Sequence, residues 1–385
     1  MKNDFIATGM LLTRFGAGLW LAAILLIPAR ATAEQEEATI SGFDEGKFTS
    51  FSFYIENDLL QPQEDEDRNY TGGFGFLFNG SFVHAARLDT PLRGLDRLTG
   101  LAKKQHEWGD RFHHSLLIFG TGFTPDRLNT RRPVLDDRPY GSLVGVSVRR
   151  LAVNDESFAE ALSSELVVAE LGLHLARNFQ TWLHRKLRAR SGEETPYDPL
   201  GWHNQISDGG EPTALYRVGY ERLLAGNPSG PLIRKNFQIT GGFAASAGYY
   251  TNVNLVANAR VGWFTRDFWE FTPGALSPGS QILGGNDSPS PPRWELFLFA
   301  GIRPRFNIYN ALLQGQFRES VHTVEIRHEQ VEWDLGVSAY IPACRLQATW
   351  NAFAGRTSEF KGGRPRTHTW GSVILSYVHP VKNRK

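Results

Sequence analysis

The chain has 385 residues, with 41 basic side chains against 40 acidic ones, 12% aromatic residues, 39 glycines and one cysteine. This nearly balanced charge excludes the strong positive field of a typical nucleic-acid-binding protein, and a single cysteine excludes an internal disulfide framework. The aromatic and glycine content favours strands and tight turns over helices.

The first residues have the pattern of a secretory signal peptide. Lys2 and Arg14 supply positive charge, residues 19–27 form a short apolar core, and Ala31-Thr32-Ala33 is a small-residue cleavage site. We therefore predict a signal peptide at residues 1–33 and a single exported domain at residues 34–385. No apolar run in that domain reaches the ~20 residues that a membrane helix needs, so it is a periplasmic protein, a secreted protein or a β-barrel.

The first two strands are predicted at residues 49–55 and 74–78, where side chains alternate in character with the period of two that strands show. One parity is mostly apolar and the other is polar or small; the apolar set is Phe51, Phe53, Ile55, Phe74, Phe76 and Phe78, and the other set includes Ser50, Ser52, Tyr54, Gly73 and Gly75. Such a pair of strands suits a wall between lipid and a narrow lumen.

Further alternating segments recur along the chain, each near the ~9–11 residues that a tilted strand needs to cross a bilayer. They are Ser142–Val148, Glu165–Leu173, Thr213–Leu223, Phe237–Tyr249, Leu255–Phe264, Glu295–Arg303, His322–Ile326, Val331–Tyr340, Arg345–Phe353 and Thr369–Val378. Trp and Tyr lie near many of their ends, as in the aromatic girdles of membrane barrels. A soluble β-sandwich would gather its aromatic residues into one core, so the recurrence on nearly every strand favours an antiparallel transmembrane β-barrel.

Two segments interrupt this rhythm. Residues 176–190 lack alternation and carry several basic side chains, which is typical of a short amphipathic helix or of an extended extracellular loop; both alternatives stay open. Residues 273–293 are rich in Pro, Gly and Ser and predict a loop.

Oxygen-bearing side chains stand at the ends of the first two strands. Asn57, Asp58 and Thr71 offer an amide, a carboxylate and a hydroxyl, which are donors that suit Ca²⁺. The same residues also fit an Asx-turn, and spacing alone does not decide between the two.

His184 is a candidate general base, because a largely neutral histidine can take a proton from water and a nearby carboxylate can orient it. A lone histidine in a basic stretch is more often a surface residue. Ser115 follows two histidines and Ser246 lies in an Ala-rich stretch, but both are weak imitations of a serine hydrolase.

Five motifs, taken together, resemble those of the outer-membrane lipid A deacylase family, the lipid A 3′-O-deacylases. They are Glu56-Asn57-Asp58, Asp67-Arg68-x-Tyr70-Thr71-x-Gly73, Asp137-Arg138-Pro139-Tyr140-Gly141, His184-Arg185 and Gly201-Trp202-x-Asn204-Gln205. Later segments, including Ser358-Glu359-Phe360, are similar as well. The resemblance covers nearly the whole exported chain.

The resemblance implies a twelve-stranded barrel in the outer membrane of a Gram-negative bacterium, which removes the 3′-linked acyloxyacyl group from lipid A in a Ca²⁺-dependent reaction. Its essential residues fall on Asn57, Asp58, Thr71 and His184. The catalytic carboxylate aligns with Glu194, with Glu193 as its rival, because the segment after His184 is longer here.

These implications define an expected mechanism and expected partners. Ca²⁺ near Asn57, Asp58 and Thr71 polarises the ester carbonyl, His184 takes a proton from the attacking water, and Glu194 orients the histidine. The partners are lipid A or lipopolysaccharide and outer-membrane lipids, with no nucleic acid, and the barrel is a monomer. Five basic side chains either bind the lipid A phosphates or belong to a solvated loop: Arg177, Arg185, Lys186, Arg188 and Arg190.

Two alternatives come from other classes of protein. A barrel phospholipase A would share the Ca²⁺ and the ester chemistry, although its His-x-Ser-Asn-Gly signature is absent, since Leu116 follows Ser115. A passive pore would share the barrel and the signal peptide but gives no reason for the polar set at the strand ends.

Overall fold

The computed structural model describes residues 45–57, 60–62, 72–109, 112–154, 156–178, 180–182, 199–229, 233–271, 294–362 and 367–379. The predicted signal peptide lies outside these residues, as does the loop predicted at 273–293. Among the described residues, no helix has the length and apolar character needed to span a membrane.

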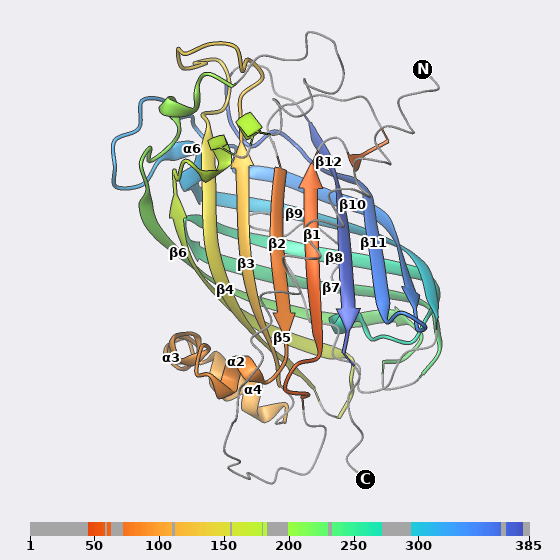
Figure 1. Ribbon diagram of the computed structural model, residues 1–385. Coiled ribbons are helices and arrows are strands. Elements are labelled where there is room, and N and C mark those ends of the chain that lie inside the picture. The colour runs from red at the N-terminus through yellow and green to blue at the C-terminus, as the bar shows by residue number, and fades with distance from the viewer. Residues whose placement is uncertain are drawn as a thin grey trace. The chain divides into compact units, whose positions relative to one another are not determined.

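Twelve antiparallel strands close into a barrel in which each strand pairs with its sequence neighbours and β1 pairs with β12 (Figure 1). The strands are β1 (Ser50–Asn57), β2 (Gly72–Asn79), β3 (Phe112–Phe123), β4 (Gly141–Val153), β5 (Glu160–Leu171), β6 (Glu211–Gly226), β7 (Lys235–Gly248), β8 (Tyr250–Phe264), β9 (Glu295–Asn310), β10 (Glu329–Ile341), β11 (Leu346–Arg356) and β12 (His368–Val378). The predicted twelve-stranded antiparallel barrel is therefore confirmed.

Strand β9 shows why these sequences form a membrane wall. Leu296, Leu298 and Ile302 are exposed on its outer face, while the alternating positions, including Arg303 and Arg305, are buried inside. A strand with this pattern presents apolar side chains to lipid on one face and polar side chains to the lumen on the other. The buried charges are paired across strands: Arg303 and Arg305 both contact Glu332 on β10, at 3.6 and 3.4 Å.

The first two strands pack through a contact that requires glycine. Tyr54 points into the barrel and is 2% exposed. It lies opposite Gly75 on β2, where a Cβ atom would stand only 2.2 Å from Tyr54 Cε1. The phenylalanines of both strands lie on the other, outward face, as the sequence predicted, and Phe51 and Phe78 contact each other there with ring centroids 5.1 Å apart.

The barrel has two unlike ends. At the loop end, where β1 finishes and β2 begins, long connections include residues 124–140, 172–210 and 311–328. At the terminal end, where β1 begins and β12 finishes, the connection between β2 and β3 carries three helices: α2 (Phe82–Ala85), α3 (Thr90–Leu98) and α4 (Leu101–Glu107). Figure 1 shows these helices beside the lower ends of the strands and the described parts of the long connections of the loop end at the top.

Helix α3 packs on the outer face of the wall. Its buried Asp96 accepts hydrogen bonds from Arg150 (3.1 Å) and Ser164 (2.9 Å). Arg149, the neighbour of Arg150 on β4, contacts Glu165 inside the barrel at 3.4 Å. Because successive residues of a strand face opposite sides, Arg150 and the helix that it contacts lie outside.

The lumen is filled at the loop end. Helix α6 (Ala311–Gln314) follows β9 and contacts β4, and Asn310 caps it by accepting a hydrogen bond from Leu312 N at 3.0 Å. Leu312 joins a large apolar cluster with inward side chains of the wall, among them Tyr54, Leu117, Phe119, Tyr250 and Trp370.

One sequence prediction is wrong, and several elements, including α6, were missed. Residues 322–326 were predicted as a strand but form a single isolated bridge, Ile326 with Phe360, and otherwise lie over α6, where Val324 N bonds Leu313 O at 2.9 Å. Strand β3 was missed. Helices α2–α4 were missed as well, in a region for which no element was predicted. The other predicted strands are present, with bounds that differ by a few residues.

Candidate functional site at the loop end

The predicted site residues divide into one that the structure describes and several that it does not. Asn57 is the last residue of β1. Asp58, Thr71, His184, Glu193 and Glu194 lie outside the described residues, so their roles stay predictions. The described residues next to these positions in the chain therefore define the surroundings of the site.

Asn57 faces the outside of the barrel. On β1 the residues Ser52, Tyr54 and Glu56 are buried within it, and the alternate residues form the outward face. Asn57 shares the parity of that outward face, at the loop end. It lies beside Gly72 of β2, where a Cβ atom would be 3.4 Å from Asn57 Nδ2.

A strip of small residues continues from Asn57 across the wall. Gly72 pairs with Gly122 of β3, and a Cβ atom at Gly122 would lie 3.3 Å from Ala176 Cβ and 3.6 Å from the Trp202 ring. Residues 175–178 and 180–182 are helical, which confirms helix over loop for the described part of the segment predicted at 176–190. The helical residues thus lie against the outer wall, next to the strip that begins at Asn57.

Trp202 holds this helical segment in place. Its Nε1 donates to Gln180 Oε1 at 2.7 Å, and both side chains are buried. Its ring packs on Tyr140 with centroids 5.0 Å apart, and Leu128 and Ala176 complete the cluster. Gln180 is four residues before His184 in the sequence, so the last described turn before the predicted base is anchored to the loop that contains Trp202.

The motif at residues 137–141 packs against the loop that contains Trp202. We call these packed segments, together with Gln180, the frame. Asp137 accepts a hydrogen bond from Asp126 N at 2.9 Å, and its carbonyl accepts one from His322 Nε2 at 2.8 Å. Tyr140 O accepts from Ile206 N at 2.9 Å. A Cβ atom at Gly201 would lie 2.5 Å from the Tyr140 ring, so glycine is needed there. The motif at residues 137–141 and the motif at residues 201–205 are therefore packed together, although they are far apart in the sequence.

Arg138 links this frame to the later motif around Glu359. Arg138 Nη1 donates to Glu359 Oε2 at 3.1 Å, and Arg356 Nη1 donates to Glu359 Oε1 at 2.7 Å. The Arg138 guanidinium also lies 4.2 Å from the centre of the Phe123 ring. Burial raises the pKa of Glu359, but the two guanidinium groups outweigh it and lower that pKa to about 2. Glu359 is therefore a charged, structural member of the frame.

The two serines compared with hydrolase nucleophiles serve the wall. Ser115 Oγ donates to Asn79 Oδ1 at 2.7 Å, and Ser246 Oγ donates to the Tyr250 carbonyl at 2.7 Å. Both hydroxyls are buried and committed to these acceptors.

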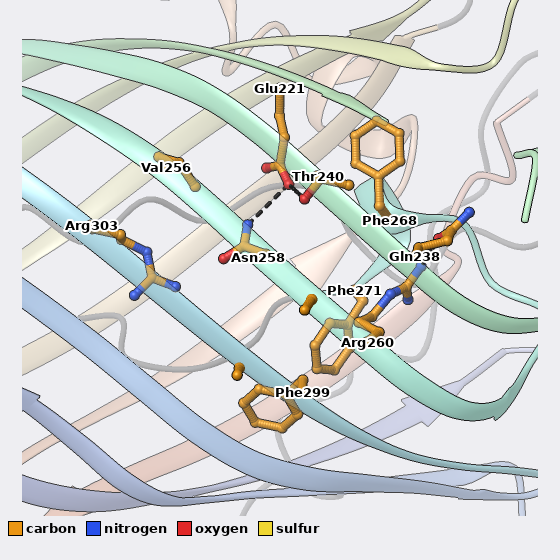
Figure 2. A pocket seen from close by; sticks show the side chains of 12 residues that line it. Glu221, Gln238, Thr240, Val256, Asn258, Arg260, Phe268, Phe271, Phe299 and Arg303 are labelled. Carbon is orange, nitrogen blue, oxygen red and sulfur yellow. Dashed lines mark hydrogen bonds between the residues drawn. The ribbon is translucent and has the colours of Figure 1, made fainter. Parts of the chain in front are cut away.

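One cavity among the described residues lies in the lumen, away from this strip. It lies on the inner faces of β6–β9, has a volume of about 30 Å³, and is lined by Glu221, Asn258 and Arg303 together with Phe271 and Phe299 (Figure 2). Asn258 donates to Glu221 at 2.9 Å there. A space of this size holds a water molecule or two, which excludes a lipid substrate.

Sequence reasoning missed the residues that shape the outer-wall strip. Gly72, Gly122, Ala176 and Gln180 carry no reactive group, so they gave no chemical signal. The available signal was the placement of glycines near the ends of strands, since glycine in a strand often marks a close approach of another segment.

The profile of the family described as outer membrane protein LpxR matches residues 19–379. The chain belongs to the LpxR family. The predicted membership of the outer-membrane lipid A deacylases is thereby confirmed, and so is the outer-membrane location. The motifs that carried the prediction span most of the LpxR match.

Solved structures agree with the LpxR fold. LpxR from Salmonella typhimurium matches with a TM-score of 0.61 and 15% identity, covering 86% of this chain and all of that one. The KdgM porin (TM-score 0.32, 6% identity, 85% of this chain and 98% of that one covered) and the β-domain of the Bordetella autotransporter BrkA (0.36, 8%, 86% and 99%) are less similar. No curated protein sequence matches the chain.

Proposed function

We infer that this member of the LpxR family is an esterase of the outer membrane that hydrolyses the 3′-linked acyloxyacyl group of lipid A. The observation that carries this proposal is the position of Asn57, on the lipid-facing side of the wall, at the loop end, beside a strip of glycines. A membrane lipid reaches that side without leaving the bilayer. Family membership supplies the substrate class.

The surroundings suit a substrate with several acyl chains and a charged head. Below Asn57 the outer wall is apolar, with Phe74 and Ile118 both exposed. Asn57 lies at the end of the barrel that has the long connections, and in outer-membrane barrels the long loops are extracellular. Lipopolysaccharide would meet the site at that end. Arg177, on the helical segment, is exposed and within the chain region that approaches the strip, so it is available to a phosphate group.

The donor set around Asn57 fits Ca²⁺. An amide, a carboxylate and a hydroxyl from Asn57, Asp58 and Thr71 are hard oxygen ligands of the kind that Ca²⁺ takes. These three residues would hold the ion, which when bound supplies a Lewis-acid contact for the ester carbonyl.

The remaining chemistry belongs to two side chains that follow Gln180 in the sequence. His184 removes a proton from the attacking water, and Glu194 orients the imidazole and stabilises its protonated form. Because the reaction needs no covalent intermediate, it needs no serine. Trp202, Tyr140 and Gln180 fix the described helical residues that precede His184 in the sequence against the outer wall.

The decisive experiment is mass spectrometry of lipid A after incubation with the refolded protein, with Ca²⁺ or with EDTA. We expect loss of the 3′ acyloxyacyl mass with Ca²⁺, no change with EDTA, and no change with His184→Ala. His203→Ala is the matched control, since His203 is an exposed histidine of the same long connection and should retain full activity.

Other outcomes would point to other functions. Release of fatty acid from phosphatidylethanolamine in preference to lipid A would replace the proposal with a phospholipase A activity. Ion conductance across planar bilayers without hydrolysis would indicate a pore, which the apolar filling of the lumen around Tyr54, Phe119 and Leu312 makes physically unfavourable.

A further inference from the structure

A group of metal-ligating side chains lies at the terminal end, at the opposite end of the barrel from Asn57. His84 of α2, Asp89 at the N-terminus of α3 and His114 of β3 each offer one ligand atom, and these atoms lie within 4.8 Å of one another. His114 is the neighbour of Ser115, which faces the lumen, so His114 faces outward, where α2 and α3 cover the wall. The three residues come from three separate elements.

The distances are close to those of a four-coordinate site. Asp89 Oδ2 lies 2.9 Å from His84 Nδ1 and 3.8 Å from His114 Nε2. Ligand atoms that surround Zn²⁺ tetrahedrally at about 2.0–2.1 Å are about 3.3 Å apart, which lies between these two values. The two histidine nitrogens lie within 4.8 Å of each other, so the three atoms can approach a common ion by side-chain adjustment.

Glu45 supplies the outer contact that metal-bound histidines usually make. Its Oε2 lies 2.7 Å from His114 Nδ1, and its Oε1 accepts the His114 backbone N–H at 2.6 Å. A carboxylate at Nδ1 fixes the proton there in the neutral ring and directs the lone pair of Nε2 toward Asp89 and His84. The ring orientation is therefore set in advance.

Asp89 lies at the N-cap position of α3, where an aspartate side chain usually accepts a hydrogen bond from the first turn of the helix. It precedes α3, yet its side chain makes no capping hydrogen bond to that helix. The side chain is fully buried, and within the described structure Oδ1 has no hydrogen-bond partner. Burying a carboxylate oxygen without a partner is costly, and a metal ion bound by the Asp89 carboxylate would offset that cost.

The types of ligand narrow the choice of metal. Arg93 Nε and Arg150 Nε lie 3.3 and 3.8 Å from Asp89 Oδ2, so their charge partly balances that of the carboxylate. Two imidazole nitrogens favour a transition metal over Ca²⁺ or Mg²⁺. We propose that His84, Asp89 and His114 bind Zn²⁺ or a similar divalent transition metal, with the fourth position open to water, and that the metal ties α2 and α3 to the outer wall.

The test is metal binding by the full chain, refolded in detergent without a histidine tag and freed of metal by a chelator. Titration with Co²⁺, followed by its visible absorption, should show one four-coordinate site per chain, and Zn²⁺ should displace the cobalt. His84→Ala should weaken binding more than tenfold. His84 is half-exposed, so this variant should fold normally, which circular dichroism and heat-modified gel mobility would check.

His106→Ala is the matched control, because His106 is an exposed histidine of the neighbouring helix α4. It should bind Co²⁺ as the unmodified protein does. Equal binding by His84→Ala and the unmodified protein would overturn the proposal, as would failure of the unmodified protein to give the four-coordinate spectrum. Since the readout is binding and not hydrolysis, it does not depend on the proposed deacylase activity.

Discussion

Trp202 donates a hydrogen bond from Nε1 to Gln180 Oε1 at 2.7 Å, and both side chains are 2% exposed. This bond joins two parts of one long connection, the helical residues that precede His184 and the loop after them. Through Trp202, which also lies against Gly122, the segment is fixed to the outer wall near Asn57.

We expect Trp202→Phe to slow hydrolysis of lipid A. The change leaves the Gln180 oxygen buried without its donor, at a cost of about 1–3 kcal/mol. If that cost loosens the segment that carries the base, the rate falls about tenfold, since ~1.4 kcal/mol corresponds to a factor of ten. Single-turnover rates by mass spectrometry would measure the effect. Trp263→Phe, on the exposed face of β8, is the control, and an equal loss of rate there would contradict this role of Trp202.

The Glu359 carboxylate should make stability depend on acid pH. Its pKa is lowered in the folded protein from about 4.5 to about 2. The stabilisation is therefore complete above the unfolded-state pKa near 4.5 and is lost as the pH falls through about 2. A shift of this size corresponds to about 3 kcal/mol. Urea unfolding of the refolded barrel at several pH values would measure it.

Glu359→Gln should remove that part of the pH dependence and lower stability by a similar amount at neutral pH, because Arg138 and Arg356 then lose their shared buried partner. Glu325→Gln is a suitable control, since Glu325 pairs with Lys361 at an exposed position. An unchanged acid profile in Glu359→Gln would show that other carboxylates dominate.

Gly75→Ala and Gly94→Ala should change stability in opposite directions. At Gly75 the added methyl group meets the Tyr54 ring, so we expect a loss of about 1–3 kcal/mol or failure to assemble. At Gly94, on α3, nothing lies within 4 Å of the added atom, and alanine should gain up to about 1 kcal/mol through helix propensity. Equal effects of the two changes would refute the packing argument.

Leu298→Arg should destabilise the barrel in lipid vesicles. Leu298 is exposed on the outward face of β9, three residues from the start of the strand, so we expect a cost between the about 2–4 kcal/mol of an arginine at the bilayer midplane and the about 0–1 kcal/mol near an interface. Leu98→Arg, on α3, makes the same chemical change at a position that is 85% exposed and outside the strands. Unfolding from vesicles should show little effect for Leu98→Arg. A similar loss in both variants would argue that β9 does not face lipid.

The assignment of the catalytic carboxylate can be decided by comparing Glu194→Ala with Glu193→Ala. We expect Glu194→Ala to lose at least about a hundredfold in hydrolysis rate, in the range of general acid–base contributions, and Glu193→Ala to retain most activity. The two adjacent residues control for local charge. The reverse result would move the role to Glu193 and leave the proposed reaction intact.

The alternation of apolar and polar residues predicted most of the strands, because one face of this wall meets lipid and the other meets a polar lumen. It failed for β3, where Leu116, Leu117 and Ile118 form a continuous apolar run. Leu117 faces the apolar cluster around Tyr54, so both faces of the strand are apolar there and no period of two remains. It also failed for residues 322–326, which alternate but lie over α6 without a partner strand.

The sequence by itself determined the two-faced strands and the membership of a family, since these depend on the order of residue types. Only the tertiary structure decided that Asn57 faces lipid beside Gly72 and Gly122, and that His84, Asp89 and His114 meet. Those relationships depend on which segments pack together across long stretches of chain, and local patterns carry no information about such contacts.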